Sequence, residues 1–378
     1  MDPQQTFCPH QECPARGQLN QGHIVIHSQQ EQRYRCKVCG KTFSARQGTV
    51  FFRSRVGSDI ITLVLTLLAY GCPTPAIEAA FGFQARTVRR WMQVAGAHCE
   101  QVHQEWVVQE RVLGQVQADE LRVRVQKEKA QGSTGVLWMA MAIAVPTRLW
   151  LGGVLSQGRD KKLMGRLATM IRACCLPGPL LLAVDGWRSY VPALHKVFRS
   201  PLHTGERKRP RLLPWPQVVI GRVIKQYGKG RGGRRCVVGV RRCLAQGSER
   251  LLRQLLRATQ DKGQGVLNTA FIERLNATFR ARLAPLVRRT RGLARRQAML
   301  QASMYLVGTV YNFCTYHDSL TLAQGPQRTP AMATGITNRC WSVAELLWHH
   351  VPPPRWTPPK QRGRRSKAMQ QLIQRWVA

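Results

Sequence analysis

The sequence predicts an α/β protein in which a mixed sheet with flanking helices follows a cysteine-rich segment and a helical module. Three observations carry this prediction. Residues 1–48 are polar and hold two closely spaced cysteine pairs, and residues 55–100 have helical patterns. Strand and helix periodicities then alternate over residues 112–320. The remaining residues, 321–378, are Pro-rich and basic and are expected to form a C-terminal tail.

The composition restricts the class of partner. The 378 residues include 58 Lys and Arg against 19 Asp and Glu, a formal net charge of +39 that is spread along the chain. Such a protein is expected to bind a polyanion. A hydrophobic content of 44% is enough to bury a core, which excludes a disordered basic arm.

No membrane partner is expected from this sequence. The longest apolar runs, residues 60–72 and 136–145, are shorter than the ~20 residues that a membrane helix needs. The first residues lack the basic and apolar segments of a secretory signal. We therefore expect a cytoplasmic, nucleoid-associated protein whose cysteines stay reduced.

Two cysteine pairs near the N-terminus have metal-ligand spacing. Four residues separate Cys8 from Cys13, two separate Cys36 from Cys39, and a strand-forming interval lies between the pairs. Four thiolates at this spacing favour tetrahedral zinc held by a small ribbon. A four-thiolate site has no open position, so this zinc is expected to be structural. The alternatives are four unrelated free cysteines and a site in which His10 replaces one thiolate.

The next region resembles a DNA-binding helical module. Residues 59–69 predict an apolar helix, and residues 74–81 and 85–93 predict two more on either side of a turn at Gly82. This is the order of a helix-turn-helix, in which outward side chains of the last helix reach base edges or phosphates. The outward side chains, opposite an inward Val88 and Trp91, are Arg86, Thr87, Arg89 and Arg90. The alternative is a helical hairpin with a solvated basic face.

The third region is expected to form the mixed sheet. Its strand patterns cover residues 116–125, 136–145, 149–155, 180–184 and 218–224. Its helical patterns cover residues 160–174, 248–259, 269–282 and 294–316. Residues 199–235 form a basic insertion rich in Pro and Gly, which either grips DNA phosphates or is a solvated loop. In the tail, residues 352–365 are expected to be extended and residues 366–378 to form one short helix.

Three acids stand out because acids are scarce in this chain. Asp119 follows a short apolar run, Asp185 closes a buried strand pattern, and Glu273 lies on a predicted helix. A carboxylate at the end of a buried strand needs an ion pair, a hydrogen bond or a metal. Three carboxylates suit two Mg²⁺ or Mn²⁺ ions, which support phosphodiester hydrolysis and transfer. The alternatives are structural ion pairs, and Glu120 in place of Asp119, since the strand register is inferred. The residues that share the helix face of Glu273 and are expected to contact DNA are Asn276 and Arg280.

Over residues 8–320 these motifs resemble the transposases of the insertion-sequence-one family and its single-reading-frame relatives. The matching segments are Tyr34-Arg-Cys-Lys-Val-Cys-Gly-Lys-Thr-Phe-Ser, Ala118-Asp-Glu-Leu, Val184-Asp-Gly-Trp-Arg-Ser-Tyr, Ile272-Glu-Arg-Leu-Asn-Ala-Thr-Phe-Arg-Ala-Arg-Leu-Ala-Pro-Leu-Val-Arg-Arg-Thr and Tyr311-Asn-Phe-Cys. The resemblance implies a ribonuclease H-like catalytic domain and a DDE-type recombinase with Asp119, Asp185 and Glu273 as its catalytic triad. Such an enzyme binds terminal inverted repeats as a multimer, nicks DNA to expose 3′-hydroxyl ends and joins them to target DNA. Relatives are often assembled by frameshifting from two reading frames, whereas this chain is continuous, and its basic insertion is longer than the resemblance implies.

Other functions stay open at this point. A zinc-dependent, sequence-specific regulator would keep its DNA binding after loss of the three acids, whereas a transposase would keep binding and lose cutting. A catalytically inactive, domesticated transposase is a second alternative, although all three acids and all four ribbon cysteines are present. A structural RNA-binding protein would fit the charge but leaves the acids unexplained. Tyr190 could suggest a tyrosine recombinase, but a packing role is favoured because no accompanying basic triad is visible.

Overall fold

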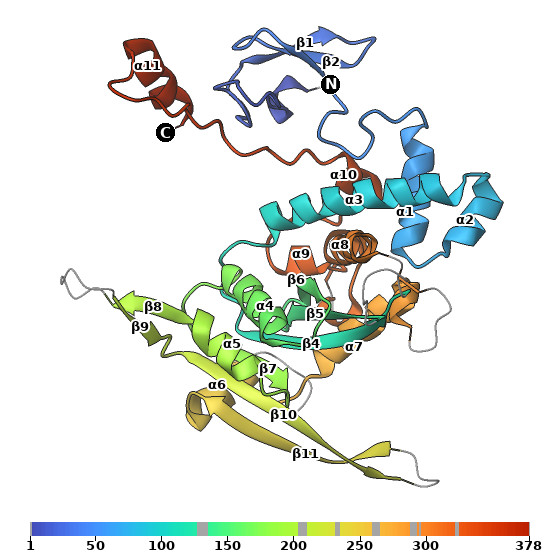
Figure 1. Ribbon diagram of the computed structural model, residues 1–378, viewed down its shortest axis with the longest axis vertical. Coiled ribbons are helices and arrows are strands. Elements are labelled where there is room, and N and C mark those ends of the chain that lie inside the picture. The colour runs from blue at the N-terminus through green and yellow to red at the C-terminus, as the bar shows by residue number, and fades with distance from the viewer. Residues whose placement is uncertain are drawn as a thin grey trace. The chain divides into compact units, whose positions relative to one another are not determined.

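The computed structural model describes residues 2–126, 135–202, 210–230, 235–258, 265–287, 293–294, 296–321 and 325–377. The chain divides into two compact units. One unit combines Met1–Thr62 with Leu347–Ala378, and the other is the continuous segment Leu63–Leu346. The order of helices and strands along the chain can be followed in Figure 1.

The smaller unit is a three-stranded ribbon with a C-terminal helix packed into its core. Its strands β1 (Ile24–Ser28), β2 (Arg33–Cys36) and β3 (Thr42–Ser44) are antiparallel and pair in chain order. The predicted helix of residues 366–378 is confirmed as α11 (Lys367–Trp376). Its Trp376 is buried among the ribbon's apolar side chains and cysteines. The extended segment before α11 is mostly exposed, apart from the buried Trp356.

The larger unit is built on a six-stranded mixed sheet. Its strands are β4 (Gln115–Arg124), β5 (Val136–Ala144), β6 (Leu149–Ser156), β7 (Leu180–Asp185), β10 (Val218–Lys229) and β11 (Arg235–Gln246). They lie in the order β11-β10-β7-β4-β5-β6, with β7 parallel to both β4 and β10 and the other pairs antiparallel. The central β7 is buried on both faces, which explains its continuous apolar run. This mixed sheet with flanking helices is consistent with the expected ribonuclease H-like architecture.

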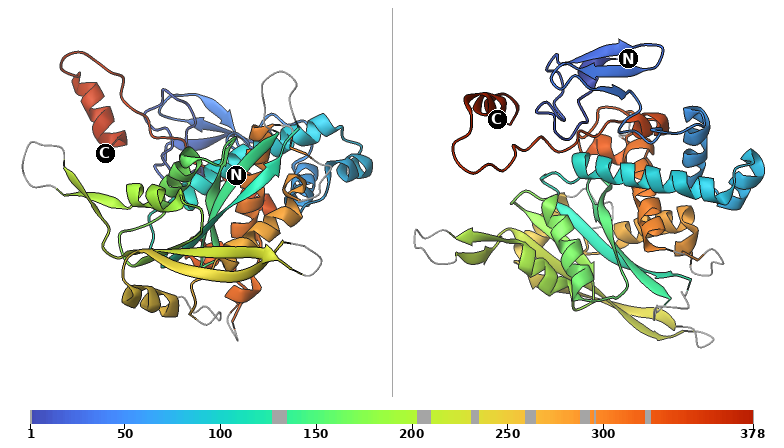
Figure 2. Two further views of the ribbon diagram at one scale, coloured as in Figure 1. Left: turned by 60° about the horizontal axis from the view of Figure 1, so that its bottom comes forward. Right: turned by 45° about the horizontal axis from the view of Figure 1, so that its top comes forward.

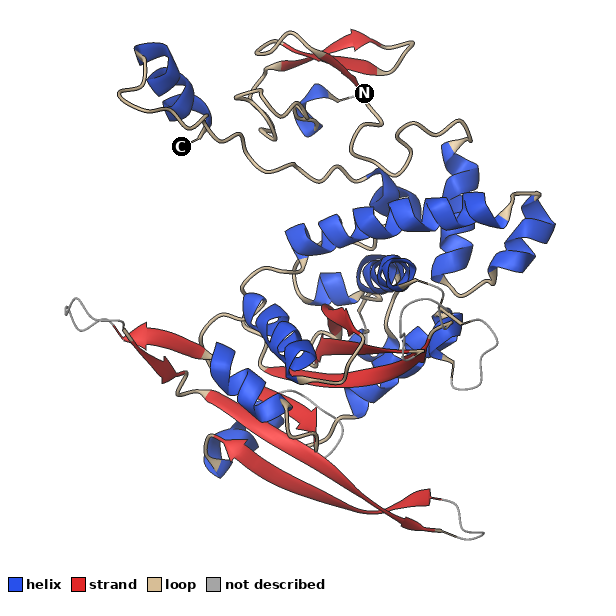
Figure 3. Cartoon of the chain, viewed as in Figure 1, coloured by secondary structure: helices blue, strands red, loops and turns tan. Residues whose placement is uncertain are grey.

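Helices cover both faces of this sheet (Figure 3). On one face, α4 (Lys161–Ala173) and α5 (Tyr190–Val197) share a core with the even-numbered residues of β4 and β7. On the other face lie α6 (Glu249–Ala258), α7 (Ala270–Arg282) and α8 (Gln297–Cys314). Because side chains alternate between faces along a strand, Asp119 and Asp185 are both directed to the face of α7.

The helical module consists of α1 (Ser58–Ala69), α2 (Thr74–Phe81) and α3 (Ala85–Trp106). The turn after α2 places Gly82 at φ 70°, where its N–H donates to the Glu78 carbonyl. Helix α3 continues beyond the predicted end at residue 93 and packs closely on α8: a Cβ at Gly96 would lie 2.3 Å from the Cα of Ala302. The predicted boundary at residue 100 therefore falls inside a helix, and α2, α3 and the sheet belong to one compact unit.

The predicted basic insertion contains more strand than its sequence indicates. The hairpin of β8 (Arg199–Leu202) and β9 (Arg211–Pro214) is exposed throughout, and β10 then leads into β11, which was not predicted (Figure 2). Strand β11 is an edge strand whose arginines interrupt its apolar residues, so no clear alternation marks it. Residues 203–209 and 231–234 of the insertion lie outside the described residues.

The predicted tail of residues 321–378 does not behave as one segment. Its first part, with α9 (Pro330–Ala333) and most of α10 (Val343–Trp348), belongs to the larger unit, where Ala331 and Leu346 are fully buried. Its last part belongs to the ribbon unit. Among the described residues, the helices are too short or too polar to cross a membrane.

Candidate active site and zinc centre

Two strands bring acidic side chains together at one edge of the larger unit's core. Ala118 of β4 pairs with Val184 of β7, so the next residues, Asp119 and Asp185, are neighbours on adjacent strands. Carboxylate oxygens of Asp119, Glu120 and Asp185 all lie within 4.8 Å of one another. Oxygen ligands at such separations fit a hard divalent cation such as Mg²⁺ or Mn²⁺. Asp119 and Asp185, whose side chains are directed to the same face of the sheet, can therefore hold a divalent metal ion.

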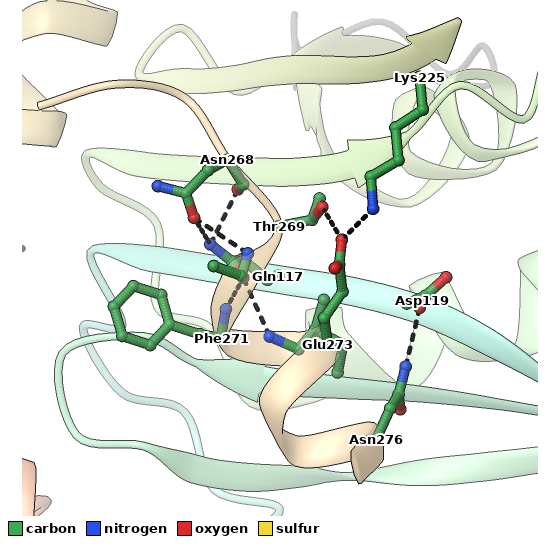
Figure 4. A network of polar contacts seen from close by, with 10 residues as sticks. Gln117, Asp119, Lys225, Asn268, Thr269, Phe271, Glu273 and Asn276 are labelled. Carbon is green, nitrogen blue, oxygen red and sulfur yellow. Dashed lines mark hydrogen bonds and ion pairs between the residues drawn. The ribbon is translucent and has the colours of Figure 1, made fainter. Parts of the chain in front are cut away.

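A buried glutamine positions the third predicted acid opposite this cluster. The Oε1 atom of Gln117 accepts hydrogen bonds from the backbone N–H groups of Phe271 (2.9 Å) and Ile272 (3.0 Å), while its Nε2 donates to the Asn268 carbonyl (2.9 Å). These bonds hold the first turn of α7 against β4, two residues before Asp119 (Figure 4). As a result, Glu273 and Asp119 line one common hollow in the surface of the protein.

Glu273 lies in this hollow but outside the set of three close carboxylates. Its Oε1 accepts from Lys225 Nζ at 2.6 Å and from Thr269 Oγ1 at 2.8 Å. The hollow, which we call the acid hollow, has a volume of about 640 Å³ and is lined by Asp119, Asp185, Glu273, Asn276 and Arg280, among others. The structure thus brings the three predicted acids to one hollow, with Glu273 held by a lysine and a threonine.

Asn276 and Arg280, which were predicted to contact DNA, have different positions in this hollow. Asn276 is 1% exposed and donates through Nδ2 to Asp119 Oδ2 at 2.8 Å. Its observed partner is therefore the carboxylate, which it orients, and a direct contact with DNA stays a prediction. Arg280 is half-buried and lines the hollow one helical turn further on.

The electrostatics of the acid hollow favour a bound cation. Burial, together with the charges of Glu120 and Asp185, raises the pKa of Asp119 to about 7. The ionised carboxylate is costly there because it has lost water and gained like-charged neighbours. A divalent cation would relieve both effects, which agrees with the oxygen donors present.

Glu120, the alternative to Asp119, points to the other face of β4. Its side chain is only 2% exposed, accepts a hydrogen bond of 2.5 Å from the Tyr190 hydroxyl and forms an ion pair with Arg159. Burial, followed by the charge of Asp185, raises the pKa of Glu120. Tyr190 is buried, as its predicted packing role requires. Asp119, and not Glu120, therefore faces the acid hollow.

Three residues of the site were not predicted from the sequence. Gln117 gave no clear signal, since its neighbours Gln115 and Asp119 are also polar. Lys225 directly follows the predicted strand of residues 218–224, in a region rich in other cations. Arg159 lies before α4 and reaches Asp185 at 3.4 Å, a contact that no local pattern indicates.

The cysteine cluster of the ribbon has the geometry of a zinc site. The Sγ atoms of Cys8 and Cys39 are 3.7 Å apart, and those of Cys13 and Cys36 are 3.8 Å apart. A tetrahedral zinc ion about 2.3 Å from each sulfur requires a separation of about 3.8 Å between sulfurs. His10 packs edge-on against Phe43 and is outside the four-sulfur set. The four thiols can therefore hold zinc without His10.

The side chains of the predicted recognition helix lie on two faces of α3. Val88 and Trp91 are buried, and Trp91 contacts Phe83 edge-on at 4.9 Å between ring centroids. The polar side chains predicted to face outward, of which Thr87 is half-buried and the arginines are exposed, are Arg86, Thr87, Arg89 and Arg90. This face is available for phosphates or base edges.

Comparisons with known proteins give little beyond this geometry. No protein-family model matches the chain, and no curated protein matches it. Six solved chains match, among them the piggyBac transposase in a cryo-EM structure of its synaptic complex with hairpin DNA. That match has 9% sequence identity and a TM-score of 0.34, and it covers 81% of this chain and 73% of the other. A likeness at this TM-score carries no conclusion about activity.

Proposed function

We propose that the protein is a DNA transposase of the insertion-sequence-one kind, which nicks DNA at element ends and joins the 3′-hydroxyl ends to target DNA. The observation that carries the proposal is the acid hollow. Within a chain of net charge +39, Asp119, Asp185 and Glu273 come from two strands and a helix to line one solvent-accessible space. In a basic protein, acids gathered in this way suit metal ions that act beside a phosphodiester.

Asp119, Asp185 and Glu273 would hold the divalent ions in this proposal. When bound, these ions activate a water or a 3′-hydroxyl group and stabilise the leaving oxygen. Asn276 orients Asp119, and Gln117 keeps α7 at a fixed distance from β4. Lys225, which pairs with Glu273, is also placed to neutralise a phosphate at the mouth of the hollow.

The N-terminal modules would select the DNA ends. A zinc ion held by the ribbon's four sulfurs would be structural, because such a site leaves no open position. Helix α3 would enter the major groove with Arg86, Arg89 and Arg90, while Thr87 contacts the backbone. Synapsis of two ends would require at least two copies of the chain.

A regulator without catalytic activity is the second candidate, and a specific observation favours it. Two of the acids are already paired with cations, Glu273 with Lys225 and Asp185 with Arg159. If these were permanent structural ion pairs, the hollow would not need metal ions and the protein would only bind DNA.

Nicking distinguishes the two candidates. A linear duplex carrying the DNA that flanks the coding sequence is incubated with Mg²⁺ and with wild type, Asp185→Ala or Glu273→Ala. The transposase proposal expects nicking by wild type, while both variants bind the duplex equally and nick it about 10³-fold more slowly or worse. Equal binding with no nicking by any of the three proteins, in Mg²⁺ and in Mn²⁺, would support the regulator.

A further inference from the structure

A second hollow adjoins the acid hollow, and the proposed chemistry does not use it. Its volume is about 850 Å³, and it shares Arg159 and Trp187 with the acid hollow. Its other walls come from the start of α4 and from α5 with the turn before it. We call it the flanking pocket. Because two lining residues are common to both hollows, one bound molecule can extend from one into the other.

The rim of the flanking pocket is cationic. Lys161, Arg188 and Lys196 line it with exposed side chains, in addition to Arg159. Its one acidic lining residue, Asp160, caps α4 by accepting from the Leu163 N–H at 2.8 Å. The pocket therefore presents an excess of positive charge and suits a phosphate.

Arg159 is held firmly at the wall between the two hollows. Its guanidinium lies over the ring of Trp187 at 4.5 Å and near that of Trp138 at 5.3 Å, measured to the ring centroids. It also pairs with the buried Glu120 and reaches Asp185 at 3.4 Å. A guanidinium held by two carboxylates and two indoles forms a well-anchored partition between the two hollows.

The floor of the flanking pocket is apolar and open. Pro192 and Ala193 of α5 contribute to it, and a Cβ added at Gly165 of α4 would meet no heavy atom within 4 Å. Pockets for small ligands have volumes of about 300–1,000 Å³ and combine an apolar lining with a few polar groups. The flanking pocket matches this description with a cationic rim and an uncharged floor.

We propose that the flanking pocket binds the nucleotide adjacent to the phosphodiester in the acid hollow. Lys161, Arg188 and Lys196 contact its phosphate, and its sugar and base lie against the floor around Gly165 and Ala193. This subsite rests on the proposed function, because the nucleotide reaches the flanking pocket only if the scissile phosphate is bound in the acid hollow. It sets the path of the strand past Trp187 and makes contacts that do not depend on base identity.

Filling the pocket tests this proposal without removing a charge. Gly165→Leu places a side chain in the open floor, and Gly165→Ala is the matched control that adds a single carbon. Both changes favour helix α4, because glycine inside a helix is destabilising relative to alanine or leucine. The triple variant Lys161→Ala/Arg188→Ala/Lys196→Ala probes the rim, and Arg250→Ala, an exposed arginine of α6, controls for loss of charge.

The readout is DNA binding in Ca²⁺, measured with duplexes in which one phosphate at a time is replaced by a neutral methylphosphonate. With wild type and Gly165→Ala, one or two adjacent positions should weaken binding about tenfold, the loss expected for a charge-assisted contact. With Gly165→Leu and the triple variant, binding to unmodified DNA should be weaker by a similar factor and the effect at those positions should disappear. Arg250→Ala should keep the wild-type pattern.

The outcomes separate this subsite from the proposed function. An unchanged methylphosphonate pattern in Gly165→Leu would overturn the subsite, whether or not the protein nicks DNA. A pattern that is present in wild type and lost in Gly165→Leu, in a protein whose wild type never nicks DNA, would leave the subsite standing as a DNA contact and reject the transposase. Competition by free thymidine monophosphate at micromolar concentration, abolished by Gly165→Leu, would assign the pocket to a free nucleotide and overturn the strand contact.

Discussion

At the residue scale, folding strongly changes the acidity of the Asp119 carboxyl group. Its pKa is raised from 3.8 to about 7, chiefly by burial and then by Glu120 and Asp185. The folded protein therefore binds this proton more tightly than the unfolded chain does. Ionisation of Asp119 destabilises the fold progressively as the pH rises from about 4 to about 7, and the full penalty applies above that range.

Asp119→Asn should remove this penalty. Without divalent cations, we expect the free energy of unfolding to increase by about 1–3 kcal/mol at pH 8 and to change little at pH 4. Urea denaturation at the two pH values measures this difference, with the exposed Glu31→Gln as control. An equal effect of Asp119→Asn at both pH values would show that Asp119 is not a strained carboxylate.

At the element scale, one buried side chain joins β4 to the start of α7. Gln117 is fully buried and satisfies two backbone N–H groups at the start of α7. Gln117→Met keeps the approximate volume and removes these bonds, so we expect unfolding to require about 2–4 kcal/mol less free energy. Urea denaturation measures the change, with the exposed Gln93→Met on α3 as control. If Gln117→Met lowers the free energy of unfolding no more than the control does, α7 is held by apolar packing alone.

The ribbon depends on a helix from the other end of the chain. Trp376 is 4% exposed, contacts His23 edge-on and accepts through its carbonyl from Gln18 Nε2 at 3.1 Å. Trp376→Ala should destabilise the ribbon by about 3–5 kcal/mol, the cost of truncating a buried aromatic side chain. We expect zinc to pass to a chromogenic chelator faster from this variant than from wild type or from the exposed Gln371→Ala. Equal transfer rates for all three would indicate that α11 does not support the zinc site.

Local patterns predicted those elements whose determinants are close in sequence. The cysteine spacing, the apolar run of β7 and the helix capped at Ser366 are examples. The length of α3 was underestimated because its second half is stabilised by α8, some two hundred residues away. The ion pairs of Arg159 and Lys225 also form between distant segments, so no window of sequence contains both partners. The site acids could be predicted because they interrupt apolar or basic surroundings. The partners of each acid could not be predicted.

At the scale of the whole molecule, the distribution of charge fits the proposed contact with DNA. The 58 cations are spread along the chain, whereas three of the 19 acids form one close cluster. Long-range attraction would bring DNA to the protein, and binding is expected to weaken steeply with salt. In the proposed function, the phosphate backbone would meet the carboxylates at the acid hollow, an arrangement that would need divalent cations between them.

Joining of a pre-nicked DNA end tests the central claim most directly, because neither a regulator nor a contaminating nuclease forms joined products. Duplexes ending in an exposed 3′-hydroxyl at the element boundary are incubated with a supercoiled plasmid, Mg²⁺ and wild type, Asp119→Ala or Glu273→Ala. We expect labelled ends to become covalently joined to plasmid with wild type, and joining to fall by about 10³-fold or more in both variants while DNA binding is unchanged. Joining that persists in either variant, or its absence in wild type with bound DNA, would contradict the assignment of these carboxylates to strand transfer.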